Sequence, residues 1–562
     1  MKKITLTINN KTVIVNENAN VLTAVREAGF NLPTLCYMKG ELPEGSCRMC
    51  LVEIEGSNKL VTACSEPVRE GMRIFTNTEK LINARRVNLE LILSTHNNDC
   101  NNCLKNTKCV LQKLSDDYNC NTERFAGGKL DSLYDDSHPS FIRDNSKCIL
   151  CRKCVITCKN QACNVLSVHN RSFESFVGTN NNLPLIDSKC TACGQCVANC
   201  PTGALVEKYE IHNVIKALND KSKMVIAATA PSVRVGLGDL FNLPAGTNVE
   251  KQMVESLMAM GFDKVFDINF GADLTIMEES AEFIERLKNN HNMPMFTSCC
   301  PAWVTYVEEY YPQFIKNLST TKSPQEIFAK VLKNYYAKTV GKDAKDIYFV
   351  SIMPCTAKKC EKLKHGDTDA VITVNELAEL INVYNIDFKT LKGKEFDDVM
   401  GLSSGAGAIF GASGGVMEAA LRTAQDTLSG KDIKDVEFRQ LRGSRGIKEA
   451  TVEVANKKIN ICVASGLNNA KTVLELIKSG KKYYDFVEIM ACPGGCINGG
   501  GMPRQMDGSV AVNKRSKALY KSDTKKTYRK SHDNPNIKKV YEYLNTLDKN
   551  EVHKMLHTTF KK

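Results

Sequence analysis

The chain has 562 residues, of which 43% are hydrophobic and 25% charged, and its formal net charge is +12. This length exceeds what a single hydrophobic core supports, so we expect about three or four domains. No stretch approaches the roughly 18 uninterrupted apolar residues of a membrane helix, so no membrane partner is expected.

The positive charge is concentrated in residues 501–562, which hold fifteen Lys and Arg against six Asp and Glu. We expect a solvated basic tail there. No basic motif interleaved with aromatic residues accompanies this charge, so nucleic-acid binding is not expected.

The first residues alternate between apolar and polar side chains from Ile4 to Val15, which predicts a strand and not the apolar segment of a signal peptide. The chain also has 24 cysteines. So many cysteines without a signal peptide indicate metal binding in a reducing compartment rather than a disulfide scaffold. We therefore expect a cytoplasmic protein.

Residues 1–78 form the first predicted domain, a β-rich module with one helix near Val21–Ala28. One C-x2-C pair with two outlying cysteines is typical of a [2Fe–2S] cluster in a ferredoxin-like β-grasp domain. Ten residues separate the first two cysteines here, whereas the plant-type pattern has four. Scattered buried cysteines are the alternative. The predicted ligands are Cys36, Cys47, Cys50 and Cys64.

Residues 79–137 form the second predicted unit. A helical pattern through 79–95 places His96 at the end of the helix, and the spacing His96-x3-Cys100-x2-Cys103-x5-Cys109 follows. A Cys3His zinc site is one interpretation. Because cluster motifs lie on both sides, we favour a [4Fe–4S] cluster with one histidine ligand.

Residues 138–209 contain a doubled cysteine pattern with the spacing x2, x2, x3. This spacing is typical of bacterial two-cluster ferredoxins, in which the fourth cysteine of each run ligates the cluster of the other run. Zinc needs only four ligands, so it does not account for both runs. Lys159 stands where proline usually follows the first run. The predicted ligands are Cys148, Cys151, Cys154 and Cys158 in the first run and Cys190, Cys193, Cys196 and Cys200 in the second.

Residues 210–562 alternate between predicted strands and helices, which indicates a large α/β domain. Four β-rich runs each end at an unusual loop, and three of these loops bear thiols. Ligands of open α/β sheets lie at the carboxyl ends of the strands, so we expect the four ends to meet in one crevice as a buried metal site. The four runs are Met224–Ala228, Met293–Phe296, Ile347–Ile352 and Phe486–Met490.

Three segments of this α/β domain resemble the signatures of [FeFe]-hydrogenases. They are Thr297-Ser298-Cys299-Cys300-Pro301, Met353-Pro354-Cys355-x2-Lys358-x2-Glu361 and Glu488-x-Met490-Ala491-Cys492-x3-Cys496-x2-Gly499-Gly500-Gly501. The resemblance covers essentially the whole chain and is to the clostridial, monomeric form with four accessory clusters, including a C-terminal segment like a small subunit. Met502 departs from the family pattern, which has glutamine there, and this puts a hydrogen bond near the active-site cubane in doubt.

The resemblance implies an active-site cofactor, the H-cluster, in which a [4Fe–4S] cubane is bridged to a two-iron subsite with CO, cyanide and azadithiolate ligands. Cys300, Cys355, Cys492 and Cys496 then correspond to the cubane ligands, and Cys496 also to the bridge. Lys358 corresponds to the partner of one cyanide, and Ser232 with the backbone after Pro231 to the partner of the other. Met353 and Met490 correspond to residues packed beside the subsite, although ordinary core packing explains them equally well.

The resemblance also implies a route for protons. Cys299 corresponds to the residue that delivers the proton, and a helix start and a nearby metal are expected to lower its thiol pKa. Glu279, Ser319 and Glu282 correspond to the relay, with Arg286 at the surface. On a helix the two glutamates and the arginine share one face, which fits a relay and fits a solvated face with an ion pair equally well.

The implied activity is that of a ferredoxin-dependent hydrogenase, 2H⁺ + 2e⁻ ⇌ H2, in a monomer that receives its two-iron subsite from maturation proteins. Ferredoxin or flavodoxin is the expected electron partner. Three alternatives remain at this point: an electron-input subunit of an NADH-quinone oxidoreductase or formate dehydrogenase, a hydrogenase-like sensor or iron–sulfur assembly protein without turnover, and a passive polyferredoxin. Four cysteines fit no cluster and are predicted to be small buried side chains: Cys120, Cys163, Cys360 and Cys462.

Overall fold

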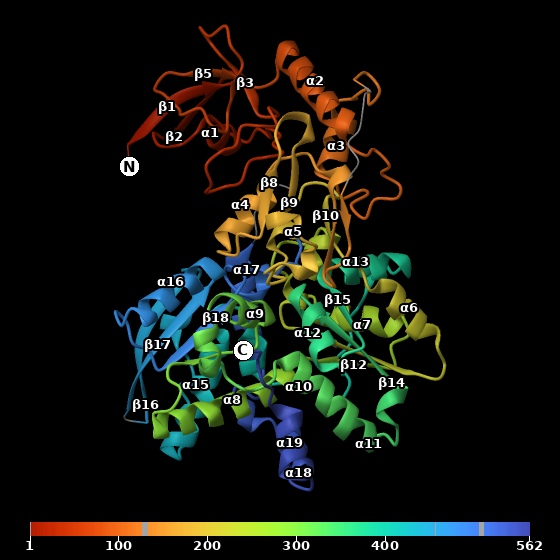
Figure 1. Cartoon of the computed structure of the whole chain (residues 1–562), viewed down its shortest axis with the longest axis vertical. Coiled ribbons are helices and arrows are strands. Elements are labelled where there is room, and N and C mark those ends of the chain that lie inside the picture. The colour runs from red at the N-terminus through yellow and green to blue at the C-terminus, as the bar shows by residue number, and fades with distance from the viewer. Residues whose placement is uncertain (1, 126–132, 456, 505–510, 562) are drawn as a thin grey trace.

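The computed structural model describes residues 2–125, 133–455, 457–504 and 511–561, which form a multidomain α/β protein (Figure 1). The N-terminal units stack above a larger body that contains residues from about 210 onward, as the colour ramp in Figure 1 shows. Within the described ranges, no helix combines the length and the apolar character needed to cross a bilayer.

The N-terminal unit is a mixed five-stranded sheet with the order β2-β1-β5-β3-β4. Alternate side chains of β1 are buried, as its sequence pattern predicts. Helix α1 (Val21–Glu27) packs on this sheet and begins at Asn20, whose side chain accepts a hydrogen bond from the Thr23 N–H. The expected helix near Val21 is therefore confirmed. The strands are β1 (Lys3–Ile8), β2 (Lys11–Asn16), β3 (Leu51–Ile54), β4 (Val61–Thr62) and β5 (Arg73–Phe75).

Two helices form the next unit, α2 (Glu79–Thr95) and α3 (Val110–Asp117). The predicted helix through 79–95 is confirmed, and it ends at His96, whose φ of −80° and ψ of 143° leave the helical region. The side chain of Cys109 caps the start of α3. The end of α2 and the start of α3 thus each carry a predicted cluster ligand, His96 and Cys109.

The doubled cysteine runs form two similar loops, each followed by a short helix, α4 (Lys153–Asn160) or α5 (Gln195–Asn199). Positive φ values recur at equivalent places, at Leu150 and Arg152 in the first run and at Ala192 and Gly194 in the second. The two runs therefore turn their backbones in the same way. They are framed by strands β6 (Tyr134–Asp135), β7 (Phe141–Asp144), β8 (Leu166–His169), β9 (Phe176–Thr179) and β10 (Leu205–Glu207).

Among the described residues, the large body contains two four-stranded sheets instead of one continuous open sheet. The first, in the order β12-β11-β14-β15, is entirely parallel. The second, in the order β13-β18-β17-β16, is parallel except for β16. The strands are β11 (Met224–Thr229), β12 (Lys264–Asp267), β13 (Met295–Phe296), β14 (Ile347–Met353), β15 (Ala370–Thr373), β16 (Ile447–Val454), β17 (Lys457–Ser465) and β18 (Phe486–Met490).

Helices cover these sheets, and the longest of them, α8 (Asn269–Asn289), packs against both α10 and α15. The others are α6 (Ile211–Asn219), α7 (Glu250–Ala259), α9 (Pro301–Tyr310), α10 (Pro324–Val331), α11 (Ala337–Thr339), α12 (Ala357–His365), α13 (Val374–Val383), α14 (Gly405–Ala408), α15 (Gly415–Ser429) and α16 (Leu467–Lys478).

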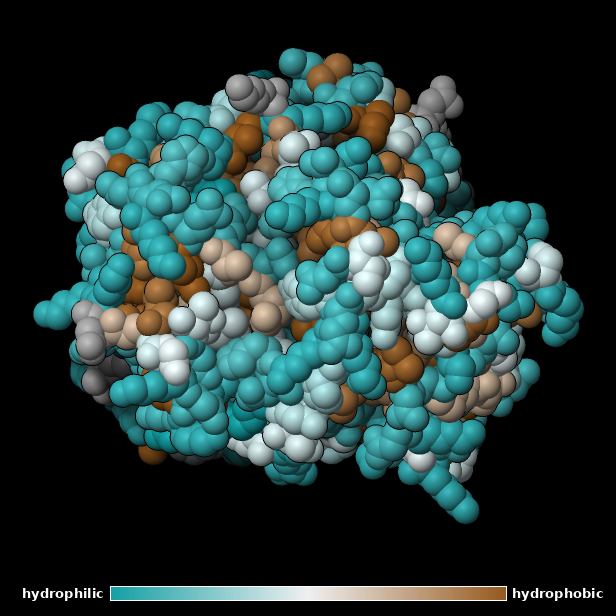
Figure 2. Space-filling view, turned by 90° about the horizontal axis from the view of Figure 1, so that it is seen from below, coloured by the Kyte–Doolittle hydropathy of each residue, from teal (hydrophilic) through white to brown (hydrophobic). Residues whose placement is uncertain are grey.

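The expectation of a solvated basic tail is wrong, because the C-terminal segment is folded. It forms α17 (Val512–Lys525), α18 (Pro535–Leu544) and α19 (Lys549–Leu556). Its apolar residues, including Leu519 and Val540, are buried in the core. The lysines mostly cover the outer side, and Figure 2 shows a mainly hydrophilic surface with small apolar patches at the end that carries α18 and α19.

Candidate active site

The two sheets of the large body share one enclosed cavity of about 80 Å³, into which four strands deliver their carboxyl ends. β11 and β14 come from one sheet and β13 and β18 from the other. The predicted convergence in one crevice is therefore confirmed, although the crevice lies between sheets. The cavity is lined by Pro231 and Ser232 after β11, Cys299 and Cys300 after β13, Met353, Cys355 and Lys358 at and after β14, and Met490 and Cys496 at and after β18.

The cavity thiols come from segments far apart in the chain. Cys300 precedes Pro301, the first residue of α9, which places it at a helix start. Cys355 lies between β14 and α12. Cys492 is buried beside these thiols but does not line the cavity, and it faces the cysteine runs of residues 148–200 instead.

The ammonium of Lys358 is held in the cavity wall by two hydrogen bonds. It donates to Glu361 Oε2 at 2.7 Å and to the carbonyl of Cys299 at 3.3 Å. Burial lowers the pKa of Lys358, but the charge and the hydrogen bond of Glu361, together with the nearby thiols, outweigh this effect, and the net shift of the pKa is upward. Ser323 and Gln325 also donate to Glu361 and orient it. Lys358 therefore presents a fixed positive charge to the cavity.

Ser232 lies at the β11 end of the same cavity. The side chain is fully buried, and its Oγ has no hydrogen-bond partner in the described part of the chain. A Cβ built on Gly411 would lie 2.4 Å from this Oγ, so only glycine leaves the hydroxyl accessible. An unpartnered donor and a buried ammonium in one cavity suit an anionic group.

Glu279 is fully buried on α8, near Cys299. Neither of its carboxylate oxygens makes a hydrogen bond of normal geometry among the described residues, but the Ser319 hydroxyl and the Ser298 N–H lie close enough to oppose the rise of its pKa. Burial, with the charge of Glu282 as the second cause, raises the pKa of Glu279 to about 8. Burial and then the charge of Glu279 raise the pKa of Cys299 well above its usual value. In the protein chain itself burial outweighs the helix start, so the part of the expected lowering of the Cys299 pKa that rests on the helix start is wrong. The part that rests on a nearby metal stays a prediction.

Glu282 and Ser319 are in direct contact, since Ser319 Oγ donates to Glu282 Oε2 at 2.8 Å. The Ser319 N–H donates to the carbonyl of Phe296 at the end of β13, which fixes the serine beside the crevice. Arg286 donates to Glu282 Oε1 at 2.5 Å and to the carbonyl of Leu318 at 2.8 Å.

The expectation that Arg286 lies at the surface is wrong. The residue is only 8% exposed, because backbone carbonyls of the 316–318 segment hold its guanidinium against Glu282. The polar groups expected to form the relay therefore lie together, but they end in a buried ion pair.

Five family descriptions match successive parts of the chain. Relatives match along its whole length: the NADP-reducing hydrogenase subunit HndD of Solidesulfovibrio fructosivorans is 42% identical over 580 residues, which cover 100% of this chain and 99% of the relative. Iron hydrogenase 1 of Clostridium pasteurianum is 40% identical over 577 residues, covering 98% of this chain and 100% of the relative. The descriptions are "2Fe-2S iron-sulfur cluster binding domain" at residues 1–79, "NADH-ubiquinone oxidoreductase-G iron-sulfur binding region" at 85–124, "4Fe-4S dicluster domain" at 147–204, "Iron only hydrogenase large subunit, C-terminal domain" at 223–500 and "Iron hydrogenase small subunit" at 509–562.

The chain belongs to the iron-only, or [FeFe], hydrogenase family.

A solved structure supports this assignment for the catalytic part. A variant of [FeFe]-hydrogenase HydA1 from Chlamydomonas reinhardtii is 37% identical and superposes with a TM-score of 0.55, covering 62% of this chain and 98% of that chain. The resemblance stated from the sequence is confirmed, and so is the multidomain fold with ferredoxin-like modules. The protein is a hydrogenase that carries iron–sulfur domains for electron transfer and the family's active-site cluster.

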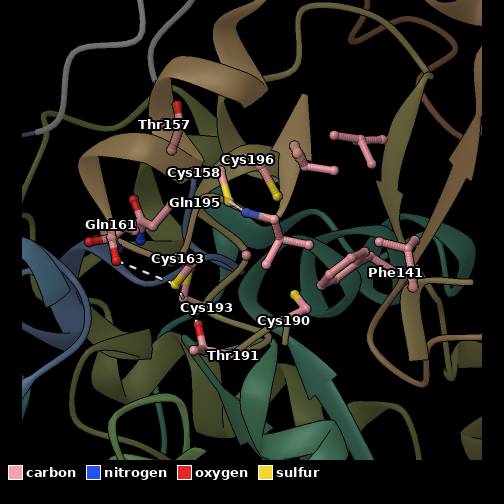
Figure 3. A pocket seen from close by; sticks show the side chains of 15 residues that line it. Phe141, Thr157, Cys158, Gln161, Cys163, Cys190, Thr191, Cys193, Gln195 and Cys196 are labelled. Carbon is pink, nitrogen blue, oxygen red and sulfur yellow. Dashed lines mark hydrogen bonds between the residues drawn. The ribbon is translucent and has the colours of Figure 1, made fainter. Parts of the chain in front are cut away.

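The doubled cysteine runs of this hydrogenase line two cavities of about 20 Å³ each. One is lined by Cys158 of the first run together with Cys190, Cys193 and Cys196 of the second, as Figure 3 shows. The other is lined by Cys148, Cys151 and Cys154 together with Cys200. The structure thus places the fourth cysteine of each run in the cavity of the other run. Among the described residues, no group of three or more His, Cys, Asp or Glu side chains is placed to hold a single metal ion.

The two remaining cluster motifs of the hydrogenase, in residues 1–78 and 79–137, contact the doubled cysteine runs that form these cavities. Cys36 and Cys47, whose sulfurs are 3.3 Å apart, pack in one apolar cluster with Cys151. Cys109 Sγ lies 3.7 Å from the carbonyl of Pro201, next to Cys200. The other predicted ligands of these two motifs occupy the same units: Cys50 and Cys64 are buried beside each other in the N-terminal unit, and His96, Cys100 and Cys103 follow α2.

Several residues were missed or misjudged from the sequence of the hydrogenase. Cys163 was predicted to be an ordinary buried cysteine, but it lines the same cavity as Cys158 (Figure 3). Cys462 is buried in β17, whereas Cys120 and Cys360 are only partly buried. Met502 packs against Gly236 and does not line the active-site cavity. Gln161 and Gln195 join the cysteine runs to the Cys492 loop, and no sequence motif marks either glutamine.

Proposed function

We propose that this hydrogenase interconverts protons and H2 in the cavity between its two sheets, 2H⁺ + 2e⁻ ⇌ H2, using a proton route through Cys299. One observation carries the proposal: a closed cavity at four strand ends combines thiols, the Lys358 ammonium and the unpartnered Ser232 hydroxyl. A thiol-lined wall suits iron, and the fixed charge with a free donor suits anionic ligands on it.

The proposed active-site ligands are Cys300, Cys355, Cys492 and Cys496, with Cys496 also as the bridge to a two-iron subsite. When bound, this H-cluster supplies the redox chemistry of proton reduction and hydrogen oxidation. Lys358 and Ser232, which both line the cavity, would hold its anionic ligands, with the backbone after Pro231 beside Ser232. Met353 and Met490, which line the cavity, would exclude water from it.

The proposed proton route starts at the Cys299 thiol. Burial raises the pKa of this thiol in the protein chain, which favours the protonated form that a proton donor needs. Glu279, with a pKa of about 8, also carries a proton at neutral pH and replaces the one that Cys299 gives up. Ser319 and Glu282 continue the route toward Arg286, which holds Glu282 in place.

The proposed electron route uses four accessory clusters in addition to the H-cluster. A [2Fe–2S] cluster in residues 1–78 and a His96-ligated [4Fe–4S] cluster in residues 79–137 would pass electrons to two [4Fe–4S] clusters in residues 138–209, and these to residues 210–562. The packing of Cys36 and Cys47 with Cys151, and the approach of Cys109 to Pro201, support this order.

A ferredoxin or flavodoxin is the proposed electron partner of a monomeric, cytosolic enzyme. The density of cysteines in cluster spacing supports a reducing compartment. A second candidate rests on the relative described as a subunit of an NADP-reducing hydrogenase. In that case this chain would exchange electrons with a separate subunit that binds the nucleotide. Light scattering of the purified chain and electron transfer from reduced ferredoxin distinguish the two arrangements.

The first test measures hydrogen evolution from reduced methyl viologen by anaerobically purified protein, produced together with the maturation proteins. We expect wild-type activity and its collapse, by at least about a hundredfold, in Cys299→Ser, because one proton-transfer group contributes about 10²–10⁴-fold to a rate. Infrared bands of CO and cyanide must persist in the variant. Cys360→Ser is the control, since Cys360 lies outside the cavity.

The outcomes separate the alternatives. A wild-type protein with these infrared bands but without turnover would be a sensor and would refute the enzymatic proposal. Equal activity of Cys299→Ser and wild type would refute the proton route while leaving the hydrogenase intact.

A further inference from the structure

Two buried glutamines at the accessory cavity, Gln161 and Gln195 (Figure 3), connect the cysteine runs to the loop that carries Cys492. Gln195 Nε2 donates to Cys492 Sγ at 3.3 Å and to the carbonyl of Asn498 at 2.9 Å. Gln161 Nε2 donates to the carbonyl of Ala491 at 2.8 Å. The two glutamines thus make similar bridges, but their ends differ. Gln195 donates to the sulfur of Cys492, whereas Gln161 donates to a backbone carbonyl of the loop and lies beside the Cys193 sulfur of the accessory cavity.

The orientation of the Gln195 amide is determined by its neighbours. The guanidinium of Arg504 contacts Oε1, and a guanidinium has donors but no acceptor. The atom that faces Arg504 must therefore be the amide oxygen, which leaves the NH2 group for Cys492. The carbonyl of Asn498 needs a donor from the same group. Both neighbours require the same orientation.

Gln195 also belongs to the wall of the accessory cavity. It precedes Cys196 in the chain and lines the cavity formed by Cys158, Cys190, Cys193 and Cys196. The backbone of the second cysteine run is in close contact with the backbone that follows Cys496, since a Cβ on Gly500 would lie 2.7 Å from the carbonyl oxygen of Cys193. One side chain therefore connects the last accessory cavity with a thiol of the active site.

We infer that Gln195 is a positioning residue that sets the reduction potential of the active-site cubane through its hydrogen bond to Cys492 Sγ. The inference rests on the proposed function, in which Cys492 is a ligand of that cubane. Hydrogen bonds to cluster sulfurs are among the factors that set iron–sulfur potentials. A donor to sulfur stabilises the more negative, reduced state, because charge strengthens a hydrogen bond. The amide raises the reduction potential and eases electron entry from the accessory side.

The test is infrared spectroelectrochemistry of the full-length holoenzyme, in which the CO and cyanide bands report the redox state of the active-site cluster. Gln195→Leu removes the donor. Gln195→Glu keeps an oxygen for Arg504, removes the NH2 donor and adds a negative charge, and the last two changes both lower the potential, so an unchanged potential in this variant still tests the inference if the leucine variant folds poorly. In both variants we expect the midpoint potential of the active-site cubane to fall by a tenfold shift in its reduction equilibrium, about 59 mV for one electron.

Gln161→Leu is the matched control, since it removes a buried amide bridge to the adjacent residue Ala491 without removing the donor to Cys492 Sγ, the sulfur assigned to the active-site cubane. Its midpoint should equal that of the wild type. A wild-type midpoint in Gln195→Glu would overturn the inference, as would an equal fall in Gln161→Leu. Wild-type bands that do not respond to potential would instead refute the proposed cluster, which keeps the two failures distinguishable.

Discussion

The two halves of this hydrogenase bring thiols together in opposite ways. In the accessory half, three of the four predicted ligands in each cavity come from one short run, such as Cys190, Cys193 and Cys196. In the catalytic half, Cys300, Cys355 and Cys496 follow different strands of two sheets. Local spacing alone positions the first kind of site, whereas the second kind exists only after the whole domain has folded.

This difference predicts different consequences of losing one ligand. An accessory cluster ties together a loop and a short helix, so its loss affects a small region. With the proposed ligands, the active-site cluster would join the ends of two sheets that have no strand in common. Its thiols therefore contribute to the stability of the catalytic body as well as to chemistry, since a structural metal that binds only the folded state adds its binding free energy to folding.

The largest expected effect is the loss of all activity in Cys355→Ala. This variant should also lose iron and have a lower thermal midpoint of the catalytic body, because the link between the sheets is gone. Cys103→Ala is the accessory counterpart and should lose one cluster while keeping hydrogen evolution with methyl viologen, which donates electrons without a docking site. Iron content, calorimetry and viologen assays measure the three quantities. Full viologen activity in Cys355→Ala would contradict the assignment of that ligand.

The next effect concerns the buried ion pair of Lys358 and Glu361, whose side chains are 9% and 8% exposed. Lys358→Met leaves the Glu361 carboxylate buried without its partner, and we expect a loss of about 3–5 kcal/mol in the free energy of unfolding. The double variant Lys358→Met with Glu361→Gln should recover most of this loss. Chemical denaturation of the chain produced without the two-iron subsite measures both.

A loss below about 1 kcal/mol in Lys358→Met would mean that water reaches Glu361 and that the wall is not closed. Glu44, paired with Arg152 on the accessory side at 3.1 Å and much more exposed, is the matched control. Arg152→Met should change the free energy of unfolding by only about 0–1 kcal/mol.

The same contrast determines how much the sequence predicts. Cysteine spacing predicts that Cys158 and Cys200 each lie in the cavity of the other run, because the runs are local and the loops repeat. Strand-end loops predict the crevice, but not its position between two sheets, since no local pattern encodes which strands pair. The burial of Arg286 was not predictable either, because its partners are backbone carbonyls of a distant segment.

Residues that join the two halves are the hardest to predict from sequence. Gln161 and Gln195 are ordinary amides until the fold places the Cys492 loop against them. The same holds for the C-terminal segment, whose charge suggested a solvated tail. Its apolar residues Ile537, Val540 and Leu544 follow helical spacing and are buried, and this periodicity was the signal that could have corrected the expectation.

A moderate and pH-dependent effect is expected for Glu279, a buried carboxyl of the catalytic half. Its pKa is about 8 in the folded protein and 4.5 in the reference state, so between these values the folded state binds one proton more than the unfolded state. The free energy of unfolding should therefore fall as the pH rises from about 4.5 to 8, by up to about 1.4 kcal/mol per pH unit. Glu279→Gln should be more stable than wild type at pH 8 and equal to it below pH 4.5.

The measurement is the thermal midpoint of both proteins between pH 5 and pH 8.5, with Glu282→Gln as the control. Glu282 is paired with Arg286, so its removal should destabilise the protein rather than flatten the pH dependence. A wild-type midpoint that rises with pH relative to Glu279→Gln would show that the carboxyl is ionised, and the proposed proton route would then lack its neutral donor.

The smallest effect is expected for the surface pair of Lys108, in the His96 unit, and Glu379 on α13, which joins the two halves. Lys108→Ala should change the free energy of unfolding by about 0–1 kcal/mol, because the lysine side chain is 41% exposed and water screens the pair. Gln161→Leu should cost about 1–3 kcal/mol, since it leaves the Leu467 N–H and the Ala491 carbonyl buried and unpaired. Denaturation at low and high salt compares the two variants. If Lys108→Ala has the larger effect on the free energy of unfolding and salt abolishes it, the halves are joined by surface charge. A larger effect of Gln161→Leu, as predicted, means that buried amides hold the two kinds of thiol site at a fixed separation.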